Sequence, residues 1–169
     1  MNLLFKIVSF SCVVFVCALS CRKPKCDETI PAIAYKNFLQ YRDAQGNMLD
    51  TAKIIITFKD CDGDIGLQDS DTKSPFDSAS KYYYNFILQY FEMVNGAWVG
   101  CDTCFRYRIS KLTSEGQSKI LEGEIGLTIS PFYFNFDSPD SDTIKFAVML
   151  YDRELHESNV VETPVILTK

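Results

Sequence analysis

Histidine and tryptophan are nearly missing from this chain of 169 residues, which contains one of each. The chain also lacks the Gly-x-Ser-x-Gly, His-Glu-x-x-His and phosphate-loop motifs of common hydrolases and nucleotide-binding proteins. An excess of basic residues is absent too, because 17 lysines and arginines stand against 22 acidic residues. A nucleic-acid surface needs a basic patch. The sequence therefore predicts a protein that is not an enzyme and does not bind nucleic acid.

Helical periodicity is not found beyond the first twenty residues, whereas alternation of apolar and polar residues recurs along the chain. Aromatic residues make up 14%, which favours β structure. Asn95-Gly96 suits a hairpin turn because both residues tolerate positive φ. We expect strands at 33–41, 53–59, 82–92, 98–99, 105–110, 121–129 and 144–150, and a closing pair near 161–167. This pattern predicts an all-β, antiparallel β-sandwich of immunoglobulin-like type with seven to eight strands, and the alternative is an up-and-down barrel.

The N-terminus is typical of a bacterial lipoprotein signal. Lys6 precedes an apolar run over 7–19 that is too short to span a bilayer comfortably. Ala18-Leu19-Ser20-Cys21 resembles a lipobox, and this resemblance implies cleavage before Cys21 and lipid attachment to it. No aspartate follows Cys21, so the signal that retains lipoproteins in the inner membrane is absent, and we expect the outer membrane. The alternative is an ordinary secretory signal with an incidental cysteine.

These observations give a domain plan: a signal peptide at 1–20, a lipid-anchored tether at 21–31 and the β-sandwich at 32–169. Within the sandwich, five carboxylates fall between residues 60 and 71, with glycines at 63 and 66. Hard cations need several converging oxygen ligands, and an alternating run of aspartates supplies them from one loop. The spacing departs from an EF-hand, since Ile65 takes the glycine position of the turn. The interpretation is a Ca²⁺ loop with Asp60, Asp62, Asp64, Asp69, Asp71 and Asp152 as candidate ligands.

Asp152 enters this set because the loop after strand 53–59 and the loop after strand 143–151 would share one end of the sandwich. Asn159 lies in the same second loop and is an alternative ligand. The competing hypothesis is a solvated acidic loop held by Asx turns and by ion pairs with Arg153 or Lys59.

Four cysteines remain after the signal and the lipidated residue: Cys26, Cys61, Cys101 and Cys104. An oxidising compartment favours two disulfides, and four cysteines allow three pairings. We favour Cys26 with Cys61 and Cys101 with Cys104. Redox activity at Cys101-x-x-Cys104 is disfavoured because the motif follows a hairpin and no βαβ pattern surrounds it.

One face of the aromatic strand carries Tyr83, Ile87 and Phe91, and Tyr83 and Phe91 are candidates for stacking on a sugar or a protein partner. The alternative is that other segments of the chain cover this face.

Asp62-Gly63-Asp64-Ile65-Gly66-Leu67, the strand over 84–90 and Leu121-Glu122-Gly123-Glu124-Ile125 resemble segments of a group of Bacteroidota outer-membrane lipoproteins. The stretch over 158–164 is similar to the closing hairpin of bacterial immunoglobulin-like domains. The resemblance implies an outer-membrane lipoprotein with a sandwich fold. We therefore expect a lipid-anchored, non-catalytic cell-envelope protein that binds or scaffolds a protein or glycan. The alternatives are an accessory subunit of an outer-membrane complex and a surface glycan-binding lipoprotein.

Overall fold

A computed structural model describes residues 26, 28–112, 120–132 and 143–168, apart from the side chains of 102–104. The predicted signal peptide at 1–20 and the lipidation site Cys21 lie outside the described residues. Within the described part of the chain, no helix is long and apolar enough to cross a membrane.

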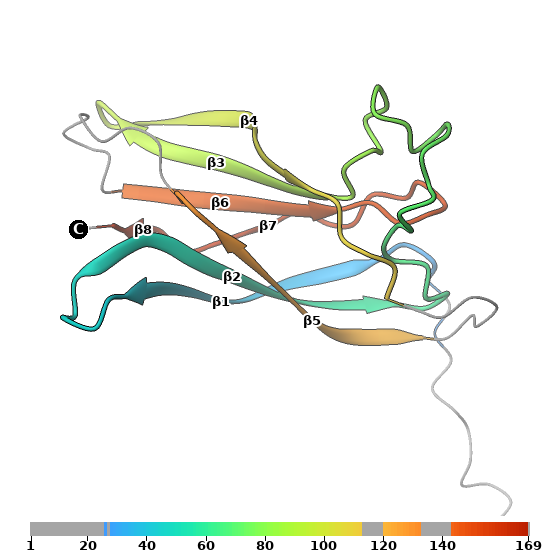
Figure 1. The fold of residues 1–169 in the computed structure, drawn as a ribbon, viewed down its shortest axis with the longest axis horizontal. Coiled ribbons are helices and arrows are strands. Elements are labelled where there is room, and N and C mark those ends of the chain that lie inside the picture. The colour runs from blue at the N-terminus through green and yellow to red at the C-terminus, as the bar shows by residue number, and fades with distance from the viewer. Residues whose placement is uncertain (1–25, 27, 113–119, 133–142, 169) are drawn as a thin grey trace, which may run out of the picture.

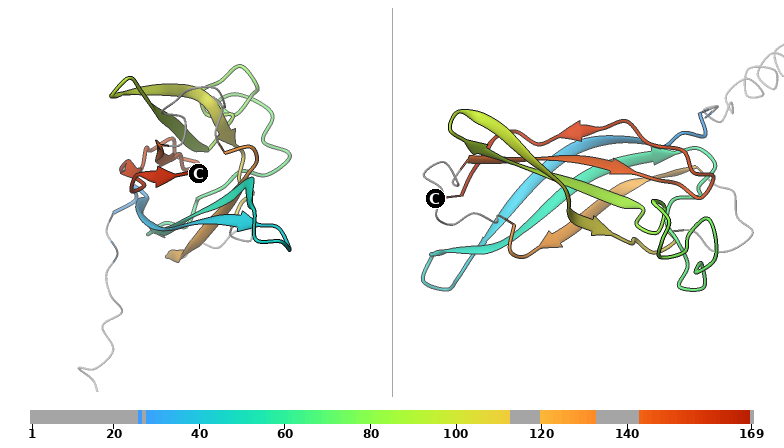
Figure 2. Two further views of the ribbon diagram at one scale, coloured as in Figure 1. Left: turned by 90° about the vertical axis from the view of Figure 1, so that its left-hand side faces the viewer. Right: turned by 90° about the horizontal axis from the view of Figure 1, so that it is seen from above.

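The described chain is all-β and forms two antiparallel sheets (Figure 1). One sheet has the order β1-β2-β5. The other has the order β4-β3-β6-β7, and β8 also pairs with β6. Their bounds are β1 Ala32–Arg42, β2 Met48–Asp60, β3 Phe86–Val94, β4 Ala97–Tyr107, β5 Leu121–Ile129, β6 Thr143–Leu150, β7 Val161–Glu162 and β8 Ile166–Leu167. Figure 2 shows the sheets as two layers, which agrees with the predicted sandwich.

The hydrophobic core lies between the two layers. Alternate residues of β2 point inward, and Ile54 and Ile56 are fully buried there. Phe86, Leu88, Phe146 and Val148 cover them from the other sheet. These inward rows confirm the period-two alternation as a sign of half-buried strands.

The predicted strand over 82–92 begins four residues later than expected. Residues 81–83 form a turn and a bend, and the buried Asn85 directly precedes the strand. The Asn85 side chain accepts a hydrogen bond from Ile109 N at 2.7 Å and donates one to Ile109 O at 3.2 Å. β3 therefore starts at Phe86. The Asn95-Gly96 turn is confirmed, with φ of 51° and 79°.

The connections after β2 and after β6 meet at one end of the sandwich, as expected (Figure 1). The chain after β2 re-enters the core at Ile65 and Leu67, which are both buried. Leu67 N donates to Ile109 O, and Lys111 N donates to Leu67 O, each at 3.0 Å. These bonds fix the acidic loop against the chain that leaves β4.

Candidate metal site

Asp60, Asp62 and Asp64 converge where β2 ends. One ligand atom from each lies within 4.8 Å of the others. Two oxygens bound to one Ca²⁺ at 2.3–2.6 Å are separated by at most about 5 Å. The spacing of the three carboxylates therefore suits a single cation among them.

Backbone turns bring these side chains together. Gly63 has φ of 74° and Gly66 has φ of 98°, which glycine adopts without strain. A Cβ on Gly66 would lie 2.3 Å from Ser110 O, so only glycine fits where the loop crosses this segment. The loop can then place Asp62 and Asp64 beside Asp60, which is the last residue of β2.

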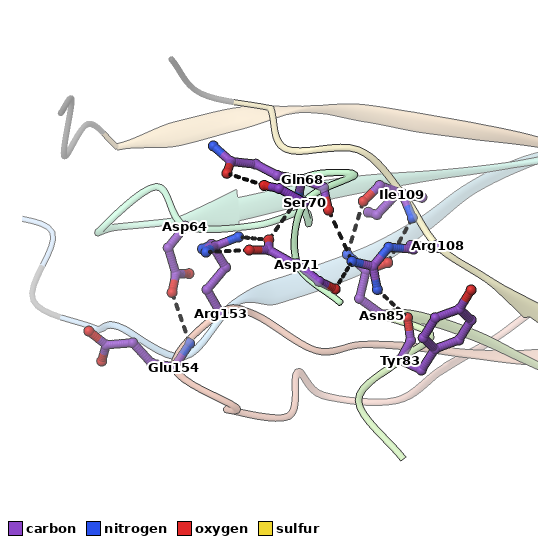
Figure 3. A network of polar contacts seen from close by, with 10 residues as sticks. All are labelled: Asp64, Gln68, Ser70, Asp71, Tyr83, Asn85, Arg108, Ile109, Arg153 and Glu154. Atoms are coloured by element: carbon purple, nitrogen blue, oxygen red, sulfur yellow. Dashed lines mark hydrogen bonds and ion pairs between the residues drawn. The ribbon is translucent and has the colours of Figure 1, made fainter. Parts of the chain in front are cut away.

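Hydrogen bonds hold one oxygen of Asp60 and of Asp64 in place. Asp60 Oδ2 accepts from Asp64 N at 2.9 Å and from Ile65 N at 3.3 Å. Asp64 Oδ2 accepts from Glu154 N at 3.0 Å (Figure 3). The other oxygen of each residue, Oδ1, is buried and has no hydrogen-bond partner in the structure. Because buried polar atoms normally have partners, these two oxygens mark a place where a cation is expected.

The electrostatics also favour a cation. Burial raises the pKa of Asp60 to about 7, and the neighbouring carboxyls of Asp62 and Asp64 add to the effect. Burial raises the pKa of Asp64 to about 6, and the charge of Asp152 is the next cause. Close carboxylates in a buried site repel, so they take up protons unless a positive ion neutralises them.

Asp152 is buried beside this group but is oriented by His156. His156 N donates to Asp152 Oδ1 at 2.7 Å, and His156 Nδ1 lies 2.8 Å from Asp152 Oδ2. This hydrogen bond and the charge of Asp152 raise the pKa of His156. Asp152 therefore adds negative charge next to Asp64, and its own oxygens are already engaged.

The structure does not bring Asp69 and Asp71 into the group, which corrects that part of the prediction. Asp71 forms an ion pair with the two terminal guanidinium nitrogens of Arg153, and this contact lowers the pKa of Asp71. Arg108 donates hydrogen bonds to the backbone carbonyls of Gln68, Asp71 and Tyr83, and these bonds hold the connection between β2 and β3 in place (Figure 3). Asp69 is exposed on the surface of the protein. The predicted ion pair with Arg153 thus exists, and it involves the outer part of the acidic loop.

The disulfide predicted between Cys26 and Cys61 is confirmed, with a Cα–Cα distance of 5.4 Å. Cys61 lies between Asp60 and Asp62, so the bridge attaches the end of the predicted tether to the acidic loop. Cys101 is also disulfide-bonded. The side chain of Cys104 is outside the described ones, and the Cys101–Cys104 pairing stays a prediction. Asn159, the alternative ligand, bonds instead to the backbone of Ile33.

Tyr83 and Phe91 do not share a strand face, which corrects that prediction. Tyr83 precedes β3, and its ring lies 4.8 Å from the Tyr84 ring and 5.2 Å from the Arg108 guanidinium. Phe91 lies on the outer face of β3, where its ring covers Gly100. Lys145 Nζ lies 5.3 Å from the centre of the Phe91 ring and 5.1 Å from that of Trp98.

Comparisons with family models, curated proteins and solved structures gave no match for this chain.

Proposed function

We propose that this protein is a lipid-anchored, non-catalytic binding or scaffolding protein of the outer membrane, and that Ca²⁺ braces the loop at its anchored end. The observation that carries the metal proposal is the buried Oδ1 of Asp60, which has no hydrogen-bond partner and lies beside two further carboxylates. Asp60, Asp62 and Asp64 would each supply oxygen to the ion. Ca²⁺ suits the site because it accepts six to eight oxygens in flexible geometry.

The lipobox-like stretch that ends at Cys21 supports the anchored location, and the disulfide between Cys26 and Cys61 agrees with an oxidising compartment outside the cytosol. An immunoglobulin-like relationship belongs to the same proposal. In chain order the first, second and fifth strands share one sheet, and the third, sixth and seventh share the other. The fourth strand pairs with the third here, whereas in constant-type immunoglobulin domains it joins the first sheet.

A thermal melt of the full chain in detergent tests the metal site. Ca²⁺ at a hundredfold excess over Kd is expected to stabilise the native state by roughly 2.7 kcal/mol relative to chelator. For a domain of this size, that is a rise in Tm of roughly 5–10 °C. Asp62→Asn should abolish the rise, because it removes a ligand charge. Asp69→Asn is the matched control, since Asp69 is an exposed aspartate of the same loop outside the group, and it should keep the rise. An equal Tm in Ca²⁺ and chelator contradicts the proposal.

One observation favours an accessory subunit over a glycan-binding protein. Two hollows on the described surface are lined by 13 residues between them, and Phe58 is the one aromatic residue among these. Sugar-binding grooves usually present aromatic faces for stacking, and these hollows do not provide them. β5, by contrast, pairs on one side only among the described strands, and its regular edge is a surface suited to another protein.

A further inference from the structure

β5 is an edge strand, and among the described residues it pairs with β2 alone. Its outer edge therefore carries backbone N–H and C=O groups that no neighbouring strand of the described chain takes up. Such an edge is a ready template for pairing with another strand, and natural proteins usually block it.

The other edges of the two sheets carry the expected protection. β1 is interrupted by register shifts between Tyr35 and Asn37 and between Gln40 and Arg42. The Asn159 side chain also binds its edge, because it accepts from Ile33 N and donates to Ile33 O, each at 2.8 Å. The β3–β4 ladder shifts register between Leu88 and Tyr90. β7 and β8 are two residues long.

β5 has none of these devices. Its nine residues pair with β2 in unbroken register from Leu121 to Ile129. Its inward side chains are also incompletely covered: Ile125 and Leu127 are half-buried, whereas Ile54 and Ile56, which lie opposite them on β2, are fully buried. A further strand beside β5 would cover these side chains and pair the open backbone.

The outward face of β5 indicates the charge of that strand. Glu122 pairs with Lys59 at 2.9 Å, and Glu124 pairs with Lys36, so both ion pairs are made on the β2 and β1 side. The two carboxylates stay at least half exposed, with side-chain exposures of 60% and 50%. Opposite charges on directly paired strands stabilise a sheet, and like charges destabilise it.

We propose that the β5 edge receives an extended strand of a partner protein, with basic residues at alternate positions and apolar residues between them. The partner strand becomes the fourth strand of the β1-β2-β5 sheet. Its basic residues lie beside Glu122 and Glu124, and its apolar residues lie over Ile125 and Leu127. The inference names a partner chemistry for the proposed binding role and rests on that role.

A second copy of this chain is the less suitable occupant. Pairing β5 with its own copy brings four half-exposed glutamates together along the new contact, whereas Lys36 and Lys59 lie on β1 and β2, away from that edge. The repulsion weakens the self-pair relative to a basic strand.

The test is amide hydrogen exchange of the full chain with a nine-residue peptide of alternating lysine and valine. We expect exchange at every second amide of β5 to slow roughly tenfold at saturation, because those amides gain hydrogen-bond acceptors. Exchange in β4 should not change. A glutamate–valine peptide of the same length should give no protection. No slowing in β5, or equal slowing in β4, overturns the inference.

Charge variants sharpen the result. The double variant Glu122→Lys with Glu124→Lys should reverse the peptide preference, so that the glutamate–valine peptide, and not the lysine–valine peptide, protects β5. Glu157→Lys with Glu162→Lys is the matched control, because these glutamates also form exposed ion pairs with lysines elsewhere on the surface. It should keep the original preference. Protection of β5 that rises with protein concentration without peptide, together with a dimer mass, overturns the inference in favour of a second copy.

This outcome is separable from the metal proposal. The peptide experiment is run in chelator and in Ca²⁺, and the melt is measured on the same samples. Loss of the Ca²⁺ effect on Tm with retained β5 protection contradicts the metal site alone. A retained Ca²⁺ effect without β5 protection contradicts the docking edge alone.

Discussion

Asp60 and Asp64 hold protons at pH values where an exposed aspartate is ionised. Their pKa values of about 7 and about 6 lie above the usual 3.8, with burial as the main cause. The native state therefore binds more protons than the unfolded state between pH 4 and pH 7. By linkage, the free energy of unfolding falls as pH rises through that window.

In chelator, we expect the free energy of unfolding to fall by on the order of 5 kcal/mol between pH 4.5 and pH 7.5, from this pair of aspartates. Urea denaturation at a series of pH values measures it. With saturating Ca²⁺ the fall should be absent or reversed, since the ion stabilises the ionised carboxylates. The double variant Asp60→Asn with Asp64→Asn removes both titrating groups and should flatten the curve in chelator. A wild-type slope in that variant would show that other groups cause the dependence.

For individual residues, the sequence predicts which carboxylates form the centre of the site, but it does not predict which nearby carboxylates are excluded from it. The alternation of Asp60, Asp62 and Asp64 with tight-turn glycines places three carboxylates in one short loop, which local spacing can reveal. The exclusion of Asp71 depends on Arg153, which is 82 residues away in the chain. Local spacing does not specify which of several nearby cations a loop carboxylate will meet in the folded chain.

At the scale of elements, Asn159 joins the connection after β6 to the start of β1. Its amide imitates one step of strand pairing, with both bonds to Ile33 at 2.8 Å. The residue is far from Ile33 in the chain, so this contact closes one end of the sandwich between its two sheets. Its loss leaves the Ile33 backbone without these two bonds.

We expect Asn159→Ala to lower the free energy of unfolding by about 2 kcal/mol, because two hydrogen bonds to the backbone of the buried Ile33 are lost. Equilibrium urea unfolding checks it. Asn37→Ala serves as the control, since the Asn37 side chain accepts from the adjacent Phe38 N within an exposed part of β1. It should change stability by less than about 0.5 kcal/mol. Equal effects of the two substitutions would contradict a bridging role for Asn159.

Strand prediction succeeded where one face of a strand is buried. It failed where a side chain, and not a backbone, makes the hydrogen bonds to the neighbouring chain. β5 matches the predicted 121–129 because its alternation runs to both ends. β3 was expected to begin at residue 82 because tyrosines alternate there as they do in strands. Asn85 instead binds both backbone groups of Ile109, and a polar residue that ends a strand in this way has no periodic signal.

At the scale of the whole molecule, the two outer faces differ in chemistry. The β1-β2-β5 face carries cross-strand ion pairs from Lys36 and Lys59, a pattern typical of a solvated sheet. On the other face, the rings of Phe91 and Trp98 both lie near Lys145, with their centres 5.3 Å and 5.1 Å from Lys145 Nζ. Period two in the sequence identifies which residues face outward. The pairing of β4 with β3, rather than with β5, is set by long-range packing that a periodic pattern does not encode.

The disulfide links the end of the proposed tether to the acidic loop, so it should affect both stability and metal affinity. Cys26 and Cys61 are separated by 35 residues, and closing a loop of that length in the unfolded chain is worth about 3–4 kcal/mol. Cys61 also lies between two proposed ligands, Asp60 and Asp62. Without the bridge, the loop must be ordered when the ion binds, and the free energy for that ordering is taken from the binding free energy.

We expect the double variant Cys26→Ala with Cys61→Ala to lower the free energy of unfolding by about 3 kcal/mol and to weaken Ca²⁺ binding roughly tenfold. Urea unfolding and calorimetric titration with Ca²⁺ measure the two effects. Cys101→Ala removes the other described disulfide cysteine, which is in β4, away from the loop after β2, and should lower stability while leaving the Kd for Ca²⁺ unchanged. If both variants weaken Ca²⁺ binding equally, the effect comes from general destabilisation. A selective loss in the Cys26 and Cys61 variant means that the bridge orders the metal loop, so that the proposed tether and the proposed metal site meet at one end of the fold.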